Sequence, residues 1–152
     1  MTISNDALSW ITSRPYVIAD GATGTNLFQV GLETGHPPEL WNVEQPEKIR
    51  QLHQSFVDAG SDLILTTSFG GTGFRLKLHQ SETRVYELNK AAAMLARDIA
   101  DKAGRRVIVA GSIGPTGELF APLGAIGRDG AIAAFTERAA ALADGGAGVL
   151  WI

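Results

Sequence analysis

Polar or small residues stand at the carboxyl ends of three apolar runs in this sequence. They are Asp20 and Gly21 after residues 16–20, Thr66, Ser68 and Phe69 in residues 62–69, and Gly111 and Ser112 in residues 106–114. A carboxylate can bind an ammonium group, a hydroxyl can donate or accept a hydrogen bond, and glycine lets the backbone approach a ligand closely. Ligands of parallel α/β proteins lie at the carboxyl ends of strands, so three such ends together predict one binding site.

Each of these residues also has a structural interpretation, which the sequence leaves open. Asp20 could cap the turn or the helix that follows it. The hydroxyls of Thr66 and Ser68 could bond to neighbouring backbone groups. The segment GSIGPTG, residues 111–117, could be a loop that needs the backbone freedom of glycine and the fixed φ of proline. The binding-site interpretation therefore depends on the three ends together rather than on any one of them.

Four strands and three helices are expected to position these residues. The runs rich in Val, Ile and Leu lie at residues 16–20, 62–69, 106–114 and 148–152, without the polar alternation of half-exposed strands. Helical periodicity covers about residues 46–60 and 82–103, and a third helix is predicted to begin near Asp129 as its N-cap. Strands that alternate with helices predict an α/β fold of parallel βαβ units.

The sequence ends within an apolar run, residues 148–152, where a buried strand is expected. Chain termini usually lie at the surface, so we expect residues 1–152 to be one domain that is truncated in its fourth strand. Four βα units make the N-terminal half of a (β/α)8 TIM barrel. The alternative is a complete small α/β domain that acts as a non-catalytic binding or assembly module. A half barrel exposes a sheet edge and apolar surface, which favours self-association. A homo-oligomer is therefore one of the states that we expect.

Composition and charge narrow the class of protein. The net charge is −3 without a basic run, which gives no support for a nucleic-acid partner. No signal-peptide pattern and no apolar stretch of about 18 residues appears, so a cytoplasmic protein without a membrane span is expected. The chain has no cysteine, and His36, His53 and His79 lack metal-ligand spacing, so no metal site is expected within it. The glycine-rich motifs of dinucleotide and P-loop sites are absent as well.

Three blocks of the sequence resemble the homocysteine S-methyltransferase family. They are ADGATGTNLFQVGL (residues 19–32), PEKIRQLHQSFVDAGSDLILTTSFGGTGFRL (residues 46–76) and AGSIGPTGELFAPLG (residues 110–124). This family includes the betaine–homocysteine methyltransferases and the homocysteine domain of cobalamin-dependent methionine synthase. The resemblance implies a (β/α)8 barrel that moves a methyl group to the zinc-bound thiolate of homocysteine, giving methionine. The resemblance does not select the methyl donor, which could be betaine, S-methylmethionine, dimethylsulfoniopropionate or methylfolate acting through cobalamin.

The resemblance also implies roles for residues at the strand ends. Asp20 matches the family aspartate that contacts the amino group of homocysteine, and Gly21 allows close backbone approach beside it. Residues 111–115, which include Gly111 and Ser112, match a loop that we expect at the rim of the pocket.

The second strand end matches the family in part. Thr66 and Phe69 match the first and last residues of a segment that usually reads T-N-T-F. Ser68 keeps a hydroxyl at the third position, whereas Thr67 stands where the family has asparagine. We therefore expect Thr66, Ser68 and Phe69 to contact homocysteine.

The zinc ligands of the family are expected outside this chain. The family's zinc cysteines come from later strands, and its glutamate beyond the fourth strand would follow Ile152. The resemblance thus implies Zn²⁺ with ligands beyond residue 152, and this chain alone is expected to be inactive. A third interpretation is a different barrel enzyme that uses Asp20 as a general base.

Overall fold

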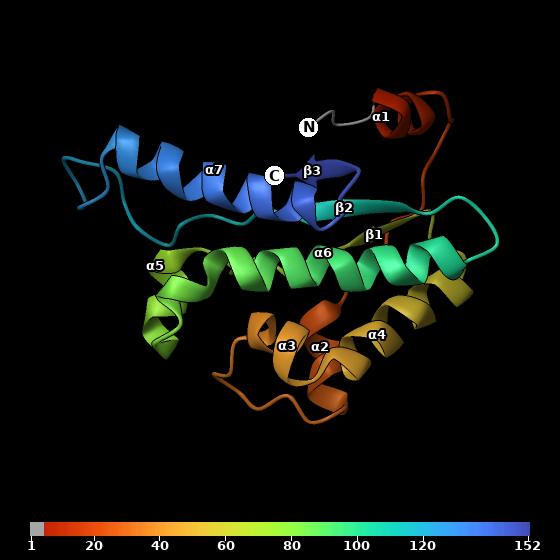
Figure 1. Ribbon diagram of the computed structural model, residues 1–152, viewed down its shortest axis with the longest axis horizontal. Helices are drawn as coiled ribbons and strands as arrows, with labels where there is room; N and C mark the ends of the chain where they lie inside the picture. The colour runs from red at the N-terminus through yellow and green to blue at the C-terminus, as the bar shows by residue number, and fades with distance from the viewer. Residues whose placement is uncertain (1–4) are drawn as a thin grey trace.

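A three-stranded parallel sheet forms the centre of the structure, a computed structural model that describes residues 5–152 (Figure 1). The strands are β1 (Leu63–Leu65), β2 (Ile108–Ser112) and β3 (Val149–Trp151), hydrogen-bonded in that order. Leu63 pairs with Ile108, and Ala110 pairs with Val149. Successive strands are neighbours and run parallel, as expected for βαβ units.

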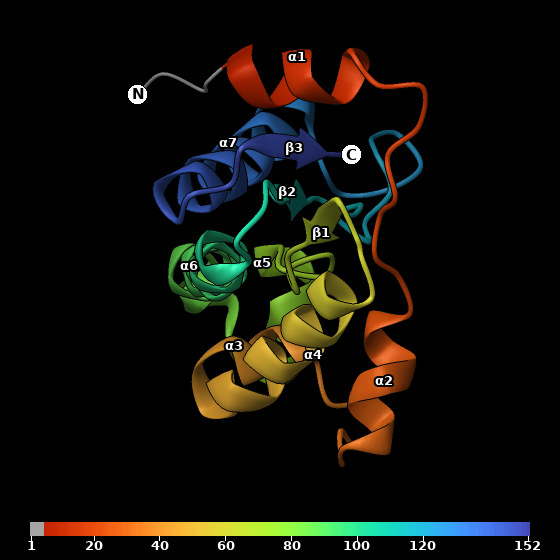
Figure 2. The same cartoon turned by 90° about the vertical axis from the view of Figure 1, so that its right-hand side faces the viewer.

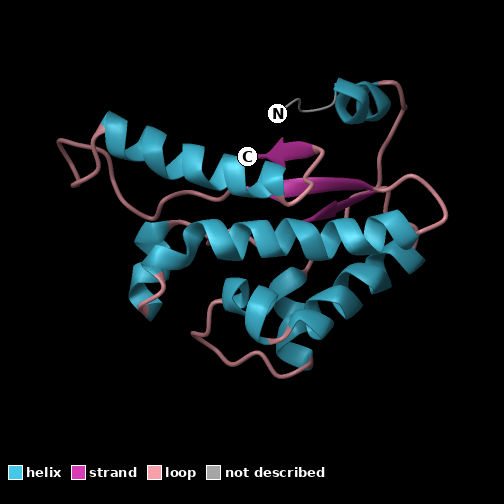
Figure 3. Ribbon diagram, in the orientation of Figure 1, coloured by secondary structure: helices cyan, strands magenta, loops and turns pink. Residues whose placement is uncertain are grey.

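Helices surround these strands, as Figure 3 shows. The α-helices are α1 (Asn5–Thr12), α2 (Thr23–Gln29), α3 (Trp41–Glu44), α4 (Pro46–Asp58), α5 (Gly73–Leu76), α6 (Val85–Lys102) and α7 (Arg128–Asp144). Single 3₁₀ turns are η1 (Pro38–Leu40), η2 (Lys77–His79) and η3 (Glu82–Arg84). Among residues 5–152, no helix combines the length and the apolar character needed to cross a membrane.

The helices predicted at residues 46–60 and 82–103 are confirmed as α4 and α6. Their periodic apolar residues are buried: Ile49, Leu52 and Val57 on α4, and Val85, Leu88, Ala92, Leu95 and Ile99 on α6. Pro46 occupies the first position of α4, where its missing N–H is not needed. α6 packs against both α4 and α7. These three helices therefore form a continuous layer.

The start of α7 differs from the sequence-based expectation. The helix begins at Arg128, and its N-cap residue is Gly127, which has no side chain that could bond to the first backbone N–H groups. The prediction of Asp129 as the N-cap is therefore wrong. Asp129 lies in the first turn, where its negative charge is still favoured by the helix dipole.

The two faces of the sheet pack against different helices. Ile64 and Val109 belong to a core cluster with residues of α4 and α6. Leu63, Ile108 and Ala110 point to the other face and pack against α1. Figure 2 shows α1 and α4 on opposite sides of the strands. Alternate strand residues thus serve opposite faces, and both faces are apolar, as the sequence predicts.

The first predicted strand, residues 16–20, is reduced to a single bridge between Ala19 and Leu63. Its backbone still lies along β1, because the N–H of Asp20 donates to the Leu63 carbonyl at 3.0 Å and the N–H of Leu63 donates to the Ile18 carbonyl at 3.1 Å. No strand pairs with its other edge in the described part of the chain, and Tyr16 is 73% exposed. The expectation of four strands is therefore wrong: three form, because this segment is paired on one side over a short length.

Candidate functional site

A cavity of about 480 Å³ lies at the carboxyl ends of β1 and β2. It is lined by residues predicted from the strand ends: Asp20, Gly21, Thr66, Ser68, Phe69 and Ser112. Gly111 is not among the lining residues. A Cβ atom on Gly111 would lie 3.1 Å from Leu142 of α7 and 3.2 Å from Leu150 of β3, so Gly111 faces the helix layer. The structure thus brings residues from the ends of all three apolar runs to one cavity.

The Asp20 carboxylate is bound to the end of β1 rather than to a helix. Its Oδ1 and Oδ2 accept a hydrogen bond from the Leu65 backbone N–H, at 3.0 and 3.1 Å. The N-cap of the following helix α2 is Ala22, so Asp20 does not cap that helix. Burial raises the pKa of Asp20 to about 6, and the hydrogen bond from Leu65 opposes this rise. A cationic ligand would restore interactions that the carboxylate loses on burial.

The hydroxyls of Thr66 and Ser68 form a hydrogen-bonded chain between β1 and β2. Ser68 Oγ donates to the Ser112 carbonyl at 2.8 Å, which uses its single hydrogen. The Thr66 hydroxyl, 2.6 Å from Ser68 Oγ, therefore donates to Ser68 and accepts from the Ser112 N–H at 2.9 Å. Both hydroxyl hydrogens are used within the protein, so these oxygens are able only to accept hydrogen bonds from a ligand.

Thr67, which stands where the family has asparagine, also lines the cavity. Its buried hydroxyl has no hydrogen-bond partner among the described residues. Its backbone carbonyl accepts from Nδ2 of Asn42 at 2.7 Å. Asn42 lies on α3, so this bond ties the segment after β1 to the helices that follow α2.

Sequence reasoning missed three charged residues at this site: Glu39 and Arg75, which line the cavity, and Arg138, which bonds to the lining segment. Glu39 in η1 lines the cavity, is only 5% exposed, and accepts from the Gly70 N–H at 2.6 Å. Arg138 in α7 is fully buried and donates to the Ser68 carbonyl at 2.7 Å. Both bonds hold the segment between β1 and α5.

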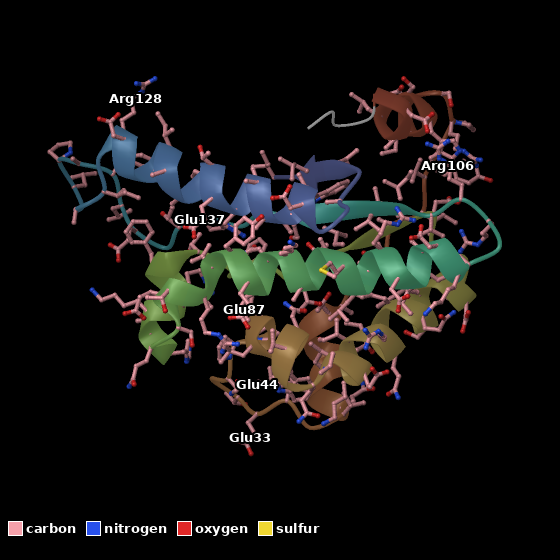
Figure 4. All side chains as sticks on the ribbon, viewed as in Figure 1. Glu33, Glu44, Glu87, Arg106, Arg128 and Glu137 are labelled. Atoms are coloured by element: carbon pink, nitrogen blue, oxygen red, sulfur yellow. The ribbon has the colours of Figure 1, made fainter. Side chains whose placement is uncertain are left out.

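The structure, and not the sequence, distinguishes the position of Arg138 on α7, because alanine occurs on every side of this helix. Arg138 lies seven residues after Ala131 and four before Leu142, both of which are buried, so it belongs to the buried face of the helix. By contrast, Arg128 and Glu33 project away from the protein in Figure 4. A charged residue on a buried face needs a buried partner, and the sequence does not identify that partner.

The described residues do not fit the zinc site that the family implies. They contain no group of three or more His, Cys, Asp or Glu side chains that could hold a metal ion, and the chain has no cysteine. His36 and His79 line the cavity, and Nε2 of His36 lies 3.4 Å from a carboxylate oxygen of Glu44. His53 is buried within α4, and this burial lowers its pKa to about 4. The thiolate donors of such a site would have to come from elsewhere.

Comparison with known proteins gives both a family and structural neighbours. The model of the homocysteine S-methyltransferase family matches residues 17–152. Methionine synthase from Mycobacterium tuberculosis (strain H37Rv) is 31% identical over 157 residues, which cover 93% of this chain and 13% of that protein.

Crystal structures of the homocysteine methyltransferase MmuM from Escherichia coli have a similar fold. The oxidized form aligns with a TM-score of 0.79 and 25% identity, over 97% of this chain and 56% of MmuM. The metallated form aligns with a TM-score of 0.76 and 27% identity, over 93% of this chain and 55% of MmuM. The chain thus spans just over half of MmuM and a small part of methionine synthase. With the family model matched over most of its length, the chain belongs to the homocysteine S-methyltransferase family.

Proposed function

We propose that the protein containing this chain, called the parent protein below, transfers a methyl group to homocysteine to give methionine. Residues 1–152 would supply the part that binds the amino acid. The observation that carries this proposal is the Asp20 carboxylate, half-buried in a cavity at the strand ends of a chain from this family. The alternative of a non-catalytic binding module has no comparable support.

Hydrogen-bond chemistry favours an ammonium group beside Asp20. The carboxylate is an acceptor, and the oxygens of Thr66 and Ser68 are restricted to accepting because their hydrogens are already used. An ammonium group offers three N–H donors and a positive charge, whereas the carboxylate of an amino acid would be repelled here. We therefore place the amino group of homocysteine at Asp20, Thr66 and Ser68, with Gly21 and Phe69 beside it.

Methyl transfer then requires the homocysteine sulfur to face the methyl donor. The homocysteine thiol gives up its proton to solvent and becomes a thiolate. A new bond then forms between the thiolate sulfur and the methyl carbon while the bond from that carbon to the donor breaks, and the electron pair of the broken bond leaves with the donor. Holding the amino group fixes the position of the sulfur and so lowers the entropy cost of the reaction. We propose that any zinc ligands of the parent protein lie outside residues 1–152.

We further propose that residues 1–152 form the N-terminal half of a (β/α)8 barrel. The parallel order β1-β2-β3 and the alignment over 56% of MmuM support this arrangement. A cytoplasmic location and a homo-oligomeric state stay predictions.

The proposal is tested by supplying the parent protein with homocysteine and, in separate reactions, betaine, S-methylmethionine, dimethylsulfoniopropionate or methylcobalamin. Methionine is measured by mass spectrometry, and homocysteine binding by calorimetry. We expect binding of homocysteine and methionine from at least one donor. Absence of homocysteine binding by the folded parent protein would contradict the proposal.

A further inference from the structure

Arg138 is a fully buried cation that bonds to the backbone of two strand ends. Its Nη1 donates to the Gly114 carbonyl at 2.8 Å, and its Nη2 donates to the carbonyls of Ser68 at 2.7 Å and Phe69 at 3.1 Å. A longer contact of 3.4 Å joins Nη2 to the Ser112 carbonyl. The planar, forked guanidinium is suited to hold carbonyls from two strands at once. Arg138 therefore links the segment after β1 to the segment after β2.

The positive charge of Arg138 is poorly compensated. Burial lowers its pKa to about 10, and the negative charge of Glu39 opposes this shift. Its Nε atom has no hydrogen-bond partner among the described residues. Burying a charge is costly unless it is paired, so the position of Glu39 relative to Arg138 matters.

The peptide group between Phe69 and Gly70 connects Arg138 to Glu39. Its carbonyl oxygen accepts from Arg138 at 3.1 Å and from the Gly114 N–H at 3.1 Å. Its N–H donates to Oε1 of Glu39 at 2.6 Å. The peptide dipole thus has its negative end at the guanidinium and its positive end at the carboxylate, and each charge strengthens the bond to the other end.

Glycine at two positions allows this close arrangement. A Cβ atom on Gly70 would lie 2.9 Å from Oε1 of Glu39, and one on Gly114 would lie 2.5 Å from the Phe69 carbonyl oxygen. Both distances are shorter than ordinary contacts between these atoms. Residues 66–70 are thus held between two charged side chains, Arg138 of α7 and Glu39 of the turn η1.

We propose that Arg138 and Glu39 are positioning residues for the amino-acid substrate. Acting through the Phe69–Gly70 peptide, they fix residues 66–69 at the cavity, so that the oxygens of Thr66 and Ser68 meet the substrate ammonium group. The same Ser112 carbonyl that accepts from Ser68 also lies within reach of Arg138. This inference rests on the proposed function and deepens it.

The test uses Arg138→Met and Glu39→Gln in the parent protein, alone and together, with KM measured separately for homocysteine and for the methyl donor. Each single change should raise KM for homocysteine, by about tenfold for Arg138→Met, and leave KM for the donor unchanged. The double variant should be no worse than Arg138→Met, because both side chains act through one peptide group.

Arg50→Met is the matched control. It removes an arginine of α4 that pairs with Glu47 and Asp98, neither of which lines the cavity. Both KM values should stay at the wild-type level in this variant.

Three results would overturn the inference: an unchanged KM for homocysteine in Arg138→Met, equal rises in KM for both substrates, or additive effects in the double variant. Should Arg138→Met fail to fold, Arg138→Lys with Glu39→Gln gives the same test, because lysine keeps the charge and loses the fork. A wild-type parent protein that does not use homocysteine refutes the proposed function as well. Normal wild-type turnover with unaffected variants refutes this inference alone.

Discussion

Burying the Asp20 carboxylate costs folding stability, and binding of a cationic ligand would explain why the protein has this residue here. Its carboxylate is half-buried, and the Leu65 N–H is its hydrogen-bond donor in the structure. One backbone donor offsets only part of the loss of water around a charged group. Strongly shifted pKa values gather at functional sites for this reason. A substrate ammonium group would supply the missing interaction.

Asp20→Asn in the parent protein should weaken homocysteine binding by about 30-fold or more, since a buried charge pair is lost. Asparagine has the same size as aspartate and keeps one acceptor oxygen, so the loss of affinity measures the contribution of the negative charge. Calorimetry gives the Kd, and zinc content measured in parallel should not change. Asp98→Asn, on the outer helix layer, should bind as the wild type does. A loss of zinc together with homocysteine would favour a purely structural role for Asp20.

Homocysteine binding should depend on pH through the same carboxylate. Because the pKa of Asp20 is about 6, affinity should fall as pH drops from 7 through 6, when the carboxylate takes up a proton and loses its charge. Asp20→Asn should remove this step, while the other ionisable side chains of the cavity, His36, His79, Glu39 and Arg75, stay the same. Identical pH profiles for wild type and variant would exclude Asp20 as the source.

Stability should change with pH in the opposite sense. The pKa of Asp20 is raised from 3.8 to about 6 by folding, so the folded state binds the proton more tightly than the unfolded state. Its stability therefore falls as pH rises from 4 to 6, and the cost is complete above pH 6. Allowing for solvent screening, Asp20→Asn should raise the Tm of the ligand-free protein by about 2 to 4 °C at pH 8. The gain should be smaller at pH 4.

Among the secondary-structure elements, periodicity in the sequence predicted the long helices α4 and α6. It predicted longer strands than those that form. The apolar stripes of α4 and α6 are confirmed, because a helix buries residues at three- and four-residue spacing. The run at residues 62–69 gives a strand of three residues, Leu63–Leu65. After this strand, the Ser68 N–H donates to the Thr66 carbonyl at 2.9 Å instead of to a residue of the neighbouring strand. Residues 66–70, which leave the sheet, all line the cavity.

The segment after β2 supports the cavity by close packing, and this is testable. Gly114→Ala should destabilise the parent protein by about 1 to 3 kcal/mol, because the new Cβ would lie 2.5 Å from the Phe69 carbonyl oxygen. Denaturant unfolding measures the change. Gly127→Ala is the control, since a Cβ there meets no atom of residues 5–152 within 4 Å and its φ of −86° suits alanine. Equal stabilities of the two variants would contradict the close approach.

At the scale of the whole molecule, the site depends on contacts between distant parts of the chain. Asp20, Thr66, Ser68 and Ser112 were predicted because each follows an apolar run, which a single sequence reveals. Arg138 and Glu39 were not, because Arg138 reaches Ser68 over 70 residues and Glu39 reaches Gly70 over 31. No local pattern encodes such a pairing, and it becomes visible only when the strands are placed side by side.

Residues 1–152 alone should bind no zinc tightly. They lack cysteine, and the described residues contain no cluster of potential metal ligands. Zinc analysis after dialysis of the 152-residue chain should therefore find only traces, and the chain should form no methionine. Zinc in a one-to-one ratio, or turnover by this chain alone, would refute the prediction.

A structure of the parent protein with homocysteine bound would test most directly whether Asp20 binds the substrate amino group. We expect the substrate amino group about 3 Å from the Asp20 carboxylate, within hydrogen-bond distance, with Thr66 and Ser68 as further acceptors and the sulfur directed away from them. Homocysteine bound outside this cavity, or with its carboxylate rather than its amino group at Asp20, would contradict this expectation.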